Sequence, residues 1–250
     1  MEITYLREIS RYKKMKTVYH PAAERGSADY GWLKPNYSFS FAGWHNPERM
    51  HFGALRVLND DYIAGGEGFD THPHDNMEIV TIPLSGAIEH RDSMGNYSVI
   101  RAGEVQIMSA GTGITHSEHN HSKDEPLTLF QIWVFPNNKG LTPTYDQINL
   151  DLIAKKNELQ CVVSPDGSGG VKINQKSWFS LGDMDKDWKG KYKLHGDDQG
   201  VYAMVVEGEV EIAGKCLGRR DAIGVWDTKE LEISVKKGSK ILLIEVPMHW

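Results

Sequence analysis

The sequence predicts an all-β protein built from two similar barrels, and three features of the chain lead to this prediction. Short apolar runs of about 4–8 residues recur along the chain, each bounded by Gly, Asn, Asp or Pro. Long segments with the 3.6-residue period of a helix are scarce. The second half of the chain repeats the pattern of the first, as a duplicated barrel should. Together these features favour a sandwich or barrel architecture.

The first half contains four segments that alternate or run apolar, at 52–69, 77–96, 97–113 and 127–136. Turn residues interrupt or end each segment and predict where strands stop; they lie at 59–61, 65–66, 85–86, 95–96, 111–113 and 136–137. After these segments, a short helix is expected within 144–158, where the alternation is weaker.

The second half returns to strand, glycine turn and strand over 201–247. Aligning "PLSGAIEH" with "VVEGEVEI" places Gly86 and Gly208 at one position, and Glu104 and Asp221 then follow in comparable apolar contexts. The link between the two copies is expected near 137–170, where turn residues concentrate.

Composition excludes several classes of function. The formal net charge is −6 and the pI about 6.0, so no global basic field would attract nucleic acid or anionic membrane. The two cysteines have no CxxC spacing, which argues against a disulfide framework and a cysteine-based zinc site. No apolar run is long enough to span a membrane, and the N-terminus lacks the apolar core of a signal peptide. The prediction is a cytoplasmic protein.

Two His-bearing strand segments predict a metal site. His72 and His74 project to one face of a strand, and Glu78 shares their parity if no bulge intervenes. Further along, His116 and Glu118 share a face in the same way. Three imidazoles and a carboxylate suit iron and neighbouring metals, and four protein ligands leave coordination positions open for chemistry. At this point either glutamate can be the carboxylate ligand.

The other histidines are interpreted as structural. His90 lies beside a predicted hairpin turn and is expected to be solvated or hydrogen-bonded, and at most one of His119 and His121 can face the pocket. In the second copy, His195 stands alone where the first copy has a pair, and it is expected to be a satisfied core or surface histidine.

Long motifs resemble the pirin family: "RGSADYGWLKPNYSFSFAGW", "GFDTHPHDNMEIVTIPLSGAIEHRDSMGN" and "AGEVQIMSAGTGITHSEHN". The resemblance covers about residues 17–247 and is strongest to bacterial pirin-like quercetinases. It implies a bicupin, two consecutive cupin barrels (double-stranded β-helices), with a metal-binding barrel at 17–140 and a degenerate barrel at 141–250. Residues 1–16 would then be an N-terminal extension. Asp75 and Asn76 depart from the family's usual "HPHRG" pattern, which leaves the histidines intact but adds an acid near the pocket mouth.

The resemblance also implies the ligands and the activity. In pirins the ligands come from the "HPH" and "HSE" motifs, here His72, His74, His116 and Glu118, which leaves Glu78 behind the ligands or in the pocket wall. One divalent ion per chain is expected, Fe(II) first, with Cu, Ni, Mn, Co or Zn as alternatives.

The implied activity is that of a quercetinase, a dioxygenase that opens a flavonol with O2 and releases CO. Glu118 would accept the proton of the flavonol 3-hydroxyl. Apolar walls would shield the reaction, with the candidates Ile79, Val105, Ile107, Met108, Phe130 and Ile132. A monomer is expected. The alternatives are an iron-dependent regulator that acts through a protein partner, and another cupin chemistry, because a barrel fold does not fix the reaction.

Overall fold

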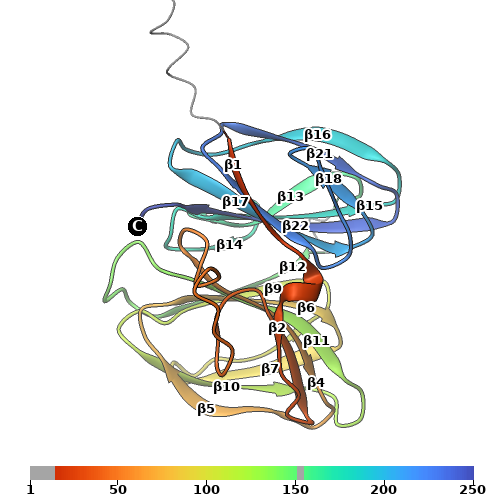
Figure 1. The fold of residues 1–250 in the computed structure, drawn as a ribbon. Helices are drawn as coiled ribbons and strands as arrows, with labels where there is room; N and C mark the ends of the chain where they lie inside the picture. Colours follow the sequence, from red (N-terminus) through yellow and green to blue (C-terminus); the bar gives the residue numbers. More distant parts are fainter. Residues whose placement is uncertain (1–14, 151–154) are drawn as a thin grey trace, which may run out of the picture.

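Strands dominate the computed structural model, which describes residues 15–150 and 155–250. A 3-10 helix, η1, spans Ala22–Glu24. None of the helices in the described part of the chain is long and apolar enough to cross a membrane. The all-β prediction is confirmed, and Figure 1 shows the strands gathered into two stacked barrels.

The first barrel packs a long sheet against a short one. The long sheet has the order β12-β9-β6-β11-β4-β3-β2, and the short sheet has the order β5-β10-β7-β8. The bounds of these strands are β2 (Gly26–Ser27), β3 (Leu33–Tyr37), β4 (Leu55–Ile63), β5 (Gly68–His74), β6 (Glu78–Ser85), β7 (Ala87–Asp92), β8 (Tyr97–Arg101), β9 (Glu104–Ser109), β10 (Ile114–Asn120), β11 (Leu127–Val134) and β12 (Thr144–Asn149).

The second barrel repeats this plan, with a long sheet ordered β1-β20-β17-β22-β15-β13-β14 and a short sheet ordered β16-β21-β18-β19. Its strands are β1 (Lys16–His20), β13 (Leu159–Ser164), β14 (Val171–Lys172), β15 (Trp178–Met184), β16 (Trp188–Lys193), β17 (Gln199–Glu207), β18 (Val210–Ile212), β19 (Lys215–Leu217), β20 (Ala222–Trp226), β21 (Glu230–Val235) and β22 (Ser239–Pro247).

Two matched turns confirm the internal repeat that the sequence predicts. Gly86 and Gly208 both adopt a positive φ, 72° and 81°, at the hairpins β6–β7 and β17–β18. The two acids that follow also play the same part: Glu104 accepts a hydrogen bond from the Arg101 N–H, three residues earlier, and Asp221 accepts one from Gly218. The aligned glycines and acids therefore mark equivalent places in two copies of one unit.

The two barrels exchange strands at the ends of the first half of the chain. Strand β1, from the N-terminal side of the first barrel, pairs with β20 of the second barrel. Strand β12 comes after residue 140, where the first barrel was expected to end, yet it pairs with β9 of the first barrel. In Figure 1, β1 lies on the upper, second barrel and runs downward from there towards η1 and the first barrel. Residues 1–14 of the expected extension lie outside the described residues.

The prediction of a short helix within 144–158 is wrong for residues 144–149. Residues 144–149 form strand β12, which pairs along its length with β9. Tyr145 and Gln147 lie on one face of this strand, and the Tyr145 ring packs 5.0 Å from His90. Tertiary pairing overrides a weak local preference here. Residues 151–154 lie outside the described part.

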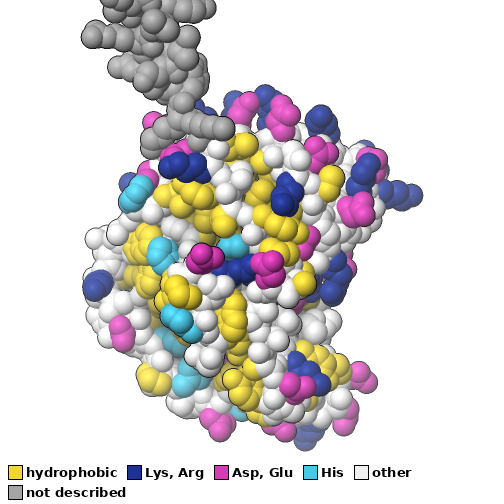
Figure 2. Space-filling view, in the orientation of Figure 1, with side chains coloured by type: hydrophobic (Ala, Val, Ile, Leu, Met, Phe, Trp, Pro, Cys, Tyr) yellow, Lys and Arg dark blue, Asp and Glu magenta, His cyan; other side chains and the backbone are white. Residues whose placement is uncertain are grey.

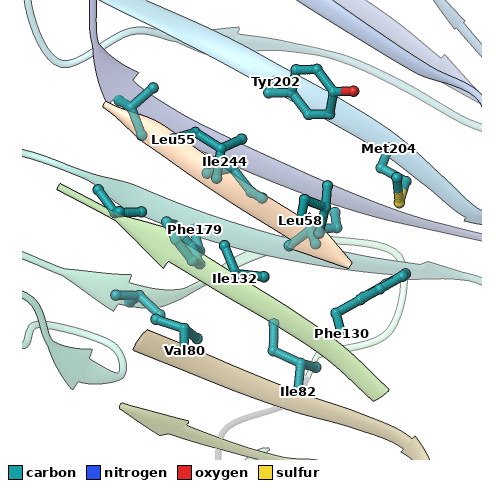
Figure 3. Close-up of a cluster of buried hydrophobic side chains, with 14 of the residues drawn as sticks. Leu55, Leu58, Val80, Ile82, Phe130, Ile132, Phe179, Tyr202, Met204 and Ile244 are labelled. Atoms are coloured by element: carbon teal, nitrogen blue, oxygen red, sulfur yellow. The ribbon is translucent and has the colours of Figure 1, made fainter. Parts of the chain in front are cut away.

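The long sheets pack face to face and form the core between the barrels. Val80 and Ile82 of β6 and Phe130 and Ile132 of β11 face apolar side chains of the second barrel, which Figure 3 shows as Phe179, Tyr202, Met204 and Ile244. Burying one such side chain stabilises a fold by roughly 1.5–3 kcal/mol. Because this core is shared, strands β6 and β17 are buried on both faces and read as continuous apolar runs in the sequence.

Charges are dispersed over the visible surface. Figure 2 shows lysine, arginine, aspartate and glutamate side chains interspersed over both barrels, while histidines gather over the first barrel on this face. An ion pair also crosses between the barrels, from Arg220 Nε to Asp60 Oδ2 at 2.7 Å, with both side chains largely buried.

Candidate metal centre

Antiparallel pairing of β5 with β10 brings the predicted histidines together. His116 lies directly opposite His72 in the register, and His74 follows two residues along the same strand. The ring of His72 lies 4.9 Å from that of His74 and 4.4 Å from that of His116, and the last two rings are 4.9 Å apart. One nitrogen of each ring lies within 4.8 Å of the others, a spacing that a single metal ion can bridge.

The local sequence explains why β5 tolerates the "HPH" motif. Pro73 cannot donate to a ladder, and β5 lies at the edge of its sheet, where a missing N–H is tolerated. The His72 Nδ1–H donates to the Asp70 carbonyl at 2.7 Å. This bond fixes the ring orientation and leaves Nε2 of His72 free to bind a metal.

Two of the three histidines, His74 and His116, are held in the neutral form that binds metal. Burial lowers the pKa of His74 to about 4 and that of His116 to about 2, and neighbouring histidines add to both effects. These two rings are therefore neutral near pH 7, as a ligand must be. Among the described residues, Nε2 of His116 is buried and has no hydrogen-bond partner. An orphaned imidazole nitrogen that faces two other imidazoles fits a bound cation.

Glu118 lies in the same pocket but closer to another histidine. A bulge between His116 and Glu118 shifts the register, and the carboxylate falls within 4.8 Å of ring nitrogens of His116 and His90. The side chain is fully enclosed and accepts hydrogen bonds from Gln131 Nε2, at 3.0 and 3.3 Å, and from Thr81 Oγ1 at 3.5 Å. Burial raises the pKa of Glu118 above its ordinary value, and His90 and Gln131 only partly offset this.

Glu78 faces away from this pocket, contrary to its expected place in the pocket wall or behind the ligands. Its carboxylate accepts hydrogen bonds from Ser109 Oγ at 2.6 Å and from the backbone N–H of Asn174 at 3.1 Å. Because Asn174 belongs to the second half of the chain, Glu78 joins the two barrels. Strand β5 ends at His74, and the turn that follows, with Asn76 at φ 46°, resets the alternation.

The pocket encloses about 200 Å³ and is lined by both apolar and polar side chains: Phe41, Asn59, Asp61, Phe69, His72, His74, Ile79, His116, Glu118, Gln131 and Trp133. The edge of Trp133 packs 4.9 Å from the His74 ring. Sequence reasoning missed the aromatic walls and the polar pair Asn59 and Asp61. Burial, together with Asp60 and Glu118, raises the pKa of Asp61 to about 8.

Most of the predicted pocket walls lie elsewhere. Of the six candidates, only Ile79 lines the pocket. Val105, Ile107, Phe130 and Ile132 belong to the core between the barrels, and Met108 packs beside Ile79 in a separate apolar cluster. On β11 the pocket is instead faced by the alternate residues Gln131 and Trp133. The candidates include both faces of β9, because apolar character alone does not say which face meets the pocket.

The remaining histidines confirm parts of the prediction. His90 is hydrogen-bonded to Asp92, as one alternative predicted, and because it is only 1% exposed it is not solvated. His119 is half-buried and lies 3.5 Å from Asp70, His121 is exposed and lies 3.5 Å from Glu89, and neither lines the pocket. His195 is satisfied by the buried Glu245, through its Nδ1 at 2.8 Å, and its ring stacks on Trp178 at 4.0 Å.

The fold and the pocket together define a class of protein, a bicupin whose first barrel holds a histidine-lined candidate metal centre. Two family models match the chain: the Pirin model over residues 18–134, and the Quercetinase C-terminal cupin domain over residues 161–246. The chain belongs to the pirin family, which confirms the resemblance seen in its motifs.

Similar proteins agree with this membership over nearly the whole chain. The chain is 44% identical to a quercetin 2,3-dioxygenase of Escherichia coli K12 over 227 residues, covering 90% of this chain and 96% of the relative. It is 35% identical to a pirin-like protein of Caulobacter vibrioides, covering 90% and 97%. The structure of the bacterial pirin YhhW of E. coli in complex with nickel(II) superposes with a TM-score of 0.87 at 41% identity, covering 93% of this chain and 99% of YhhW.

Proposed function

We propose that this protein is a metal-dependent dioxygenase of the quercetinase type, which opens a flavonol with O2 and releases CO. The observation that carries the proposal is the cluster of His72, His74 and His116 in a pocket that also holds Glu118. The names of the relatives, quercetin 2,3-dioxygenase and pirin, support it.

The ligands in this proposal are the three histidines and Glu118. Imidazole and carboxylate donors suit Fe(II), the expected metal, and also Ni, Co, Mn, Cu or Zn. The nickel(II) complex of YhhW, which is 41% identical to this chain, supports the binding of a divalent ion. When bound, the ion supplies a positive charge that lowers the pKa of a substrate hydroxyl.

Glu118 would act as the base that accepts the proton of the flavonol 3-hydroxyl. Its raised pKa suits this role, because a buried carboxylate in apolar surroundings holds a proton more readily than one in water. Gln131 and Thr81 would keep the carboxylate oriented through the hydrogen bonds that they donate to it. Glu118 and Gln131 line the pocket, and Thr81 contacts Glu118 from behind it.

The pocket walls suit a flat aromatic substrate. Phe41, Phe69 and Trp133 line it and would pack against a ring while they exclude water. Its volume of about 200 Å³ is below the roughly 300–1,000 Å³ of pockets that bury drug-sized ligands. We infer that the pocket encloses the hydroxyketone part of a flavonol and that the rest of the substrate extends to the mouth.

Oxygen uptake with quercetin tests the proposal. Protein purified without oxygen and loaded with Fe(II) or Ni(II) is mixed with quercetin in an oxygen electrode, and CO is assayed in the headspace. We expect uptake and CO from the intact protein, loss of both in His74→Ala, and retention of both in His195→Ala, a histidine of the second barrel that lies outside the pocket.

The outcomes separate the alternatives. If the intact protein binds metal but consumes no oxygen with quercetin under any loading, the dioxygenase proposal fails and a metal-dependent regulator becomes the better account. If no metal binds at all, both accounts fail.

A further inference from the structure

Behind the pocket, a buried histidine contacts the far side of His116. His90 Nδ1 lies 3.5 Å from His116 Nδ1, and the two ring centroids are 5.2 Å apart. On its other side, His90 Nε2 lies 3.2 Å from Asp92 Oδ2, with both side chains almost fully buried. Asp92, His90 and His116 thus form a chain that ends at the orphaned Nε2 of His116.

The donors and acceptors along this chain fix the protons on both rings. A carboxylate only accepts hydrogen bonds, so His90 Nε2 carries the hydrogen, and with one proton on the ring His90 Nδ1 is an acceptor. His116 Nδ1 must then be the donor to His90, which leaves Nε2 of His116 with a lone pair directed at His72 and His74. The opposite tautomer of His116 would place two lone pairs against each other.

Asp92 is held firmly enough to start such a chain. It lies at the end of β7, where its Oδ1 accepts hydrogen bonds from the N–H groups of Met94 and Asn96, and its Oδ2 accepts one from Asn96 Nδ2 at 2.8 Å. In the β7–β10 register, Asp92 is opposite His116 and His90 is opposite Glu118. The hairpin turn therefore sets the position of the carboxylate relative to the metal pocket.

We propose that His90, held by Asp92, is a positioning residue that keeps His116 in the tautomer and orientation in which its Nε2 binds the metal. This inference rests on the metal centre of the proposed function and adds a residue that the chain's motifs did not predict. Partners of this kind commonly change metal affinity by about 10- to 100-fold when they are removed.

The second barrel supports this role by contrast. The place of His90 in the ladder, opposite Glu118, is taken in the second barrel by Ile212, which is opposite Ile233. The barrel that has the pocket histidines has a buried histidine at this position, and the barrel that has an apolar interior has an isoleucine there. His90 also lies within 4.8 Å of His116 and Glu118, but its Nδ1 faces His116 Nδ1, and it does not line the pocket that holds His72 and His74.

Cobalt(II) titration of the whole protein tests the proposal, because its absorption bands report both occupancy and coordination number. His90→Ile copies the second barrel and removes the acceptor, whereas His90→Asn places an amide oxygen near the position of Nδ1. His20→Phe, at a buried histidine bonded to Tyr202 away from the pocket, is the matched control. Thermal unfolding of the metal-free proteins checks folding, and His90→Phe replaces His90→Ile if the latter does not fold.

We expect Co(II) affinity to fall about 10- to 100-fold in His90→Ile and to stay within about threefold of the intact protein in His90→Asn and His20→Phe. Equal affinity in His90→Ile and the intact protein would overturn the proposal, as would an equal loss in His90→Ile and His90→Asn. Bands in His90→Asn that indicate one ligand fewer would make His90 a ligand instead. Failure of the intact protein to bind Co(II) would count against the proposed function itself.

Discussion

The two barrels have the same pattern of strand pairing but carry different side chains at equivalent positions. In the first barrel His116 is opposite His72, and in the second barrel Leu231 is opposite Tyr192. Glu118, two residues beyond His116, corresponds to Ile233, two residues beyond Leu231.

The difference has a physical consequence. Leu231 and Ile233 are nearly fully buried and pack in the apolar core of the second barrel. Such a core needs no ion and stabilises the fold through burial alone. The first barrel instead keeps a pocket in which some buried polar atoms, among them Asn59 Oδ1, Asp61 Oδ1 and His116 Nε2, have no hydrogen-bond partner among the described residues, and unpaired groups of this kind cost stability. The duplicated scaffold thus carries chemistry in one copy and packing in the other.

The largest expected effect comes from replacing the pocket carboxylate, which the second barrel lacks. We expect Glu118→Gln to lower the rate of quercetin turnover by about 10²- to 10⁴-fold, the usual contribution of a positioned base, because the amide cannot accept the proton. Steady-state oxygen uptake measures this, with Glu67→Gln, an exposed acid outside the pocket, as the control. Turnover within a few-fold of the intact protein would show that Glu118 is not the base.

A smaller effect is expected at the other glutamate. Glu78→Ala leaves Ser109 and the Asn174 N–H without their acceptor, so the free energy of unfolding should fall by about 1–3 kcal/mol. Nickel(II) affinity should stay unchanged, because Glu78 faces the second barrel. Urea unfolding and a nickel titration measure the two quantities, and a collapse of affinity would make Glu78 the carboxylate ligand.

A third prediction concerns the pH dependence of stability, which should differ between the polar interior of the first barrel and the apolar interior of the second. The pKa of Asp61 is raised to about 8, so the folded state holds this proton more tightly than the unfolded chain does. That contribution is full below about pH 4 and is lost as the pH rises through about 8.

Asp61→Asn should therefore stabilise the metal-free protein relative to the intact one at pH 8.5, by up to about 5 kcal/mol because the pKa rises from 3.8 to about 8 at about 1.4 kcal/mol per unit, and by much less at pH 4.5. Differential scanning fluorimetry at the two pH values measures this. An equal difference at both would contradict the raised pKa.

Much of this architecture could be predicted from alternation and turn residues. The duplicated barrels followed from matched glycine turns, and the histidine cluster followed from pairs spaced two residues apart. The choice between Glu78 and Glu118 could not be derived in this way, because the turn at Asn76 breaks the alternation that links Glu78 to His74.

The pocket walls were mispredicted for a related reason. Strand β6 is buried on both faces along most of its length, so apolar character did not reveal which face meets the pocket and which meets the second barrel. His90 had a visible signal, since it shares a strand face with Asp92 two residues later. Its contact with His116 depends on the pairing of β7 with β10, which no local pattern reveals.

The central claim is that one metal centre exists per chain and lies in the first barrel. Metal analysis of anaerobically reconstituted protein tests it most directly, for the intact chain, His74→Ala and His195→Ala. The account predicts about one equivalent in the intact protein and in His195→Ala, and almost none in His74→Ala. Two equivalents in the intact protein, or a loss of metal in His195→Ala, would contradict it.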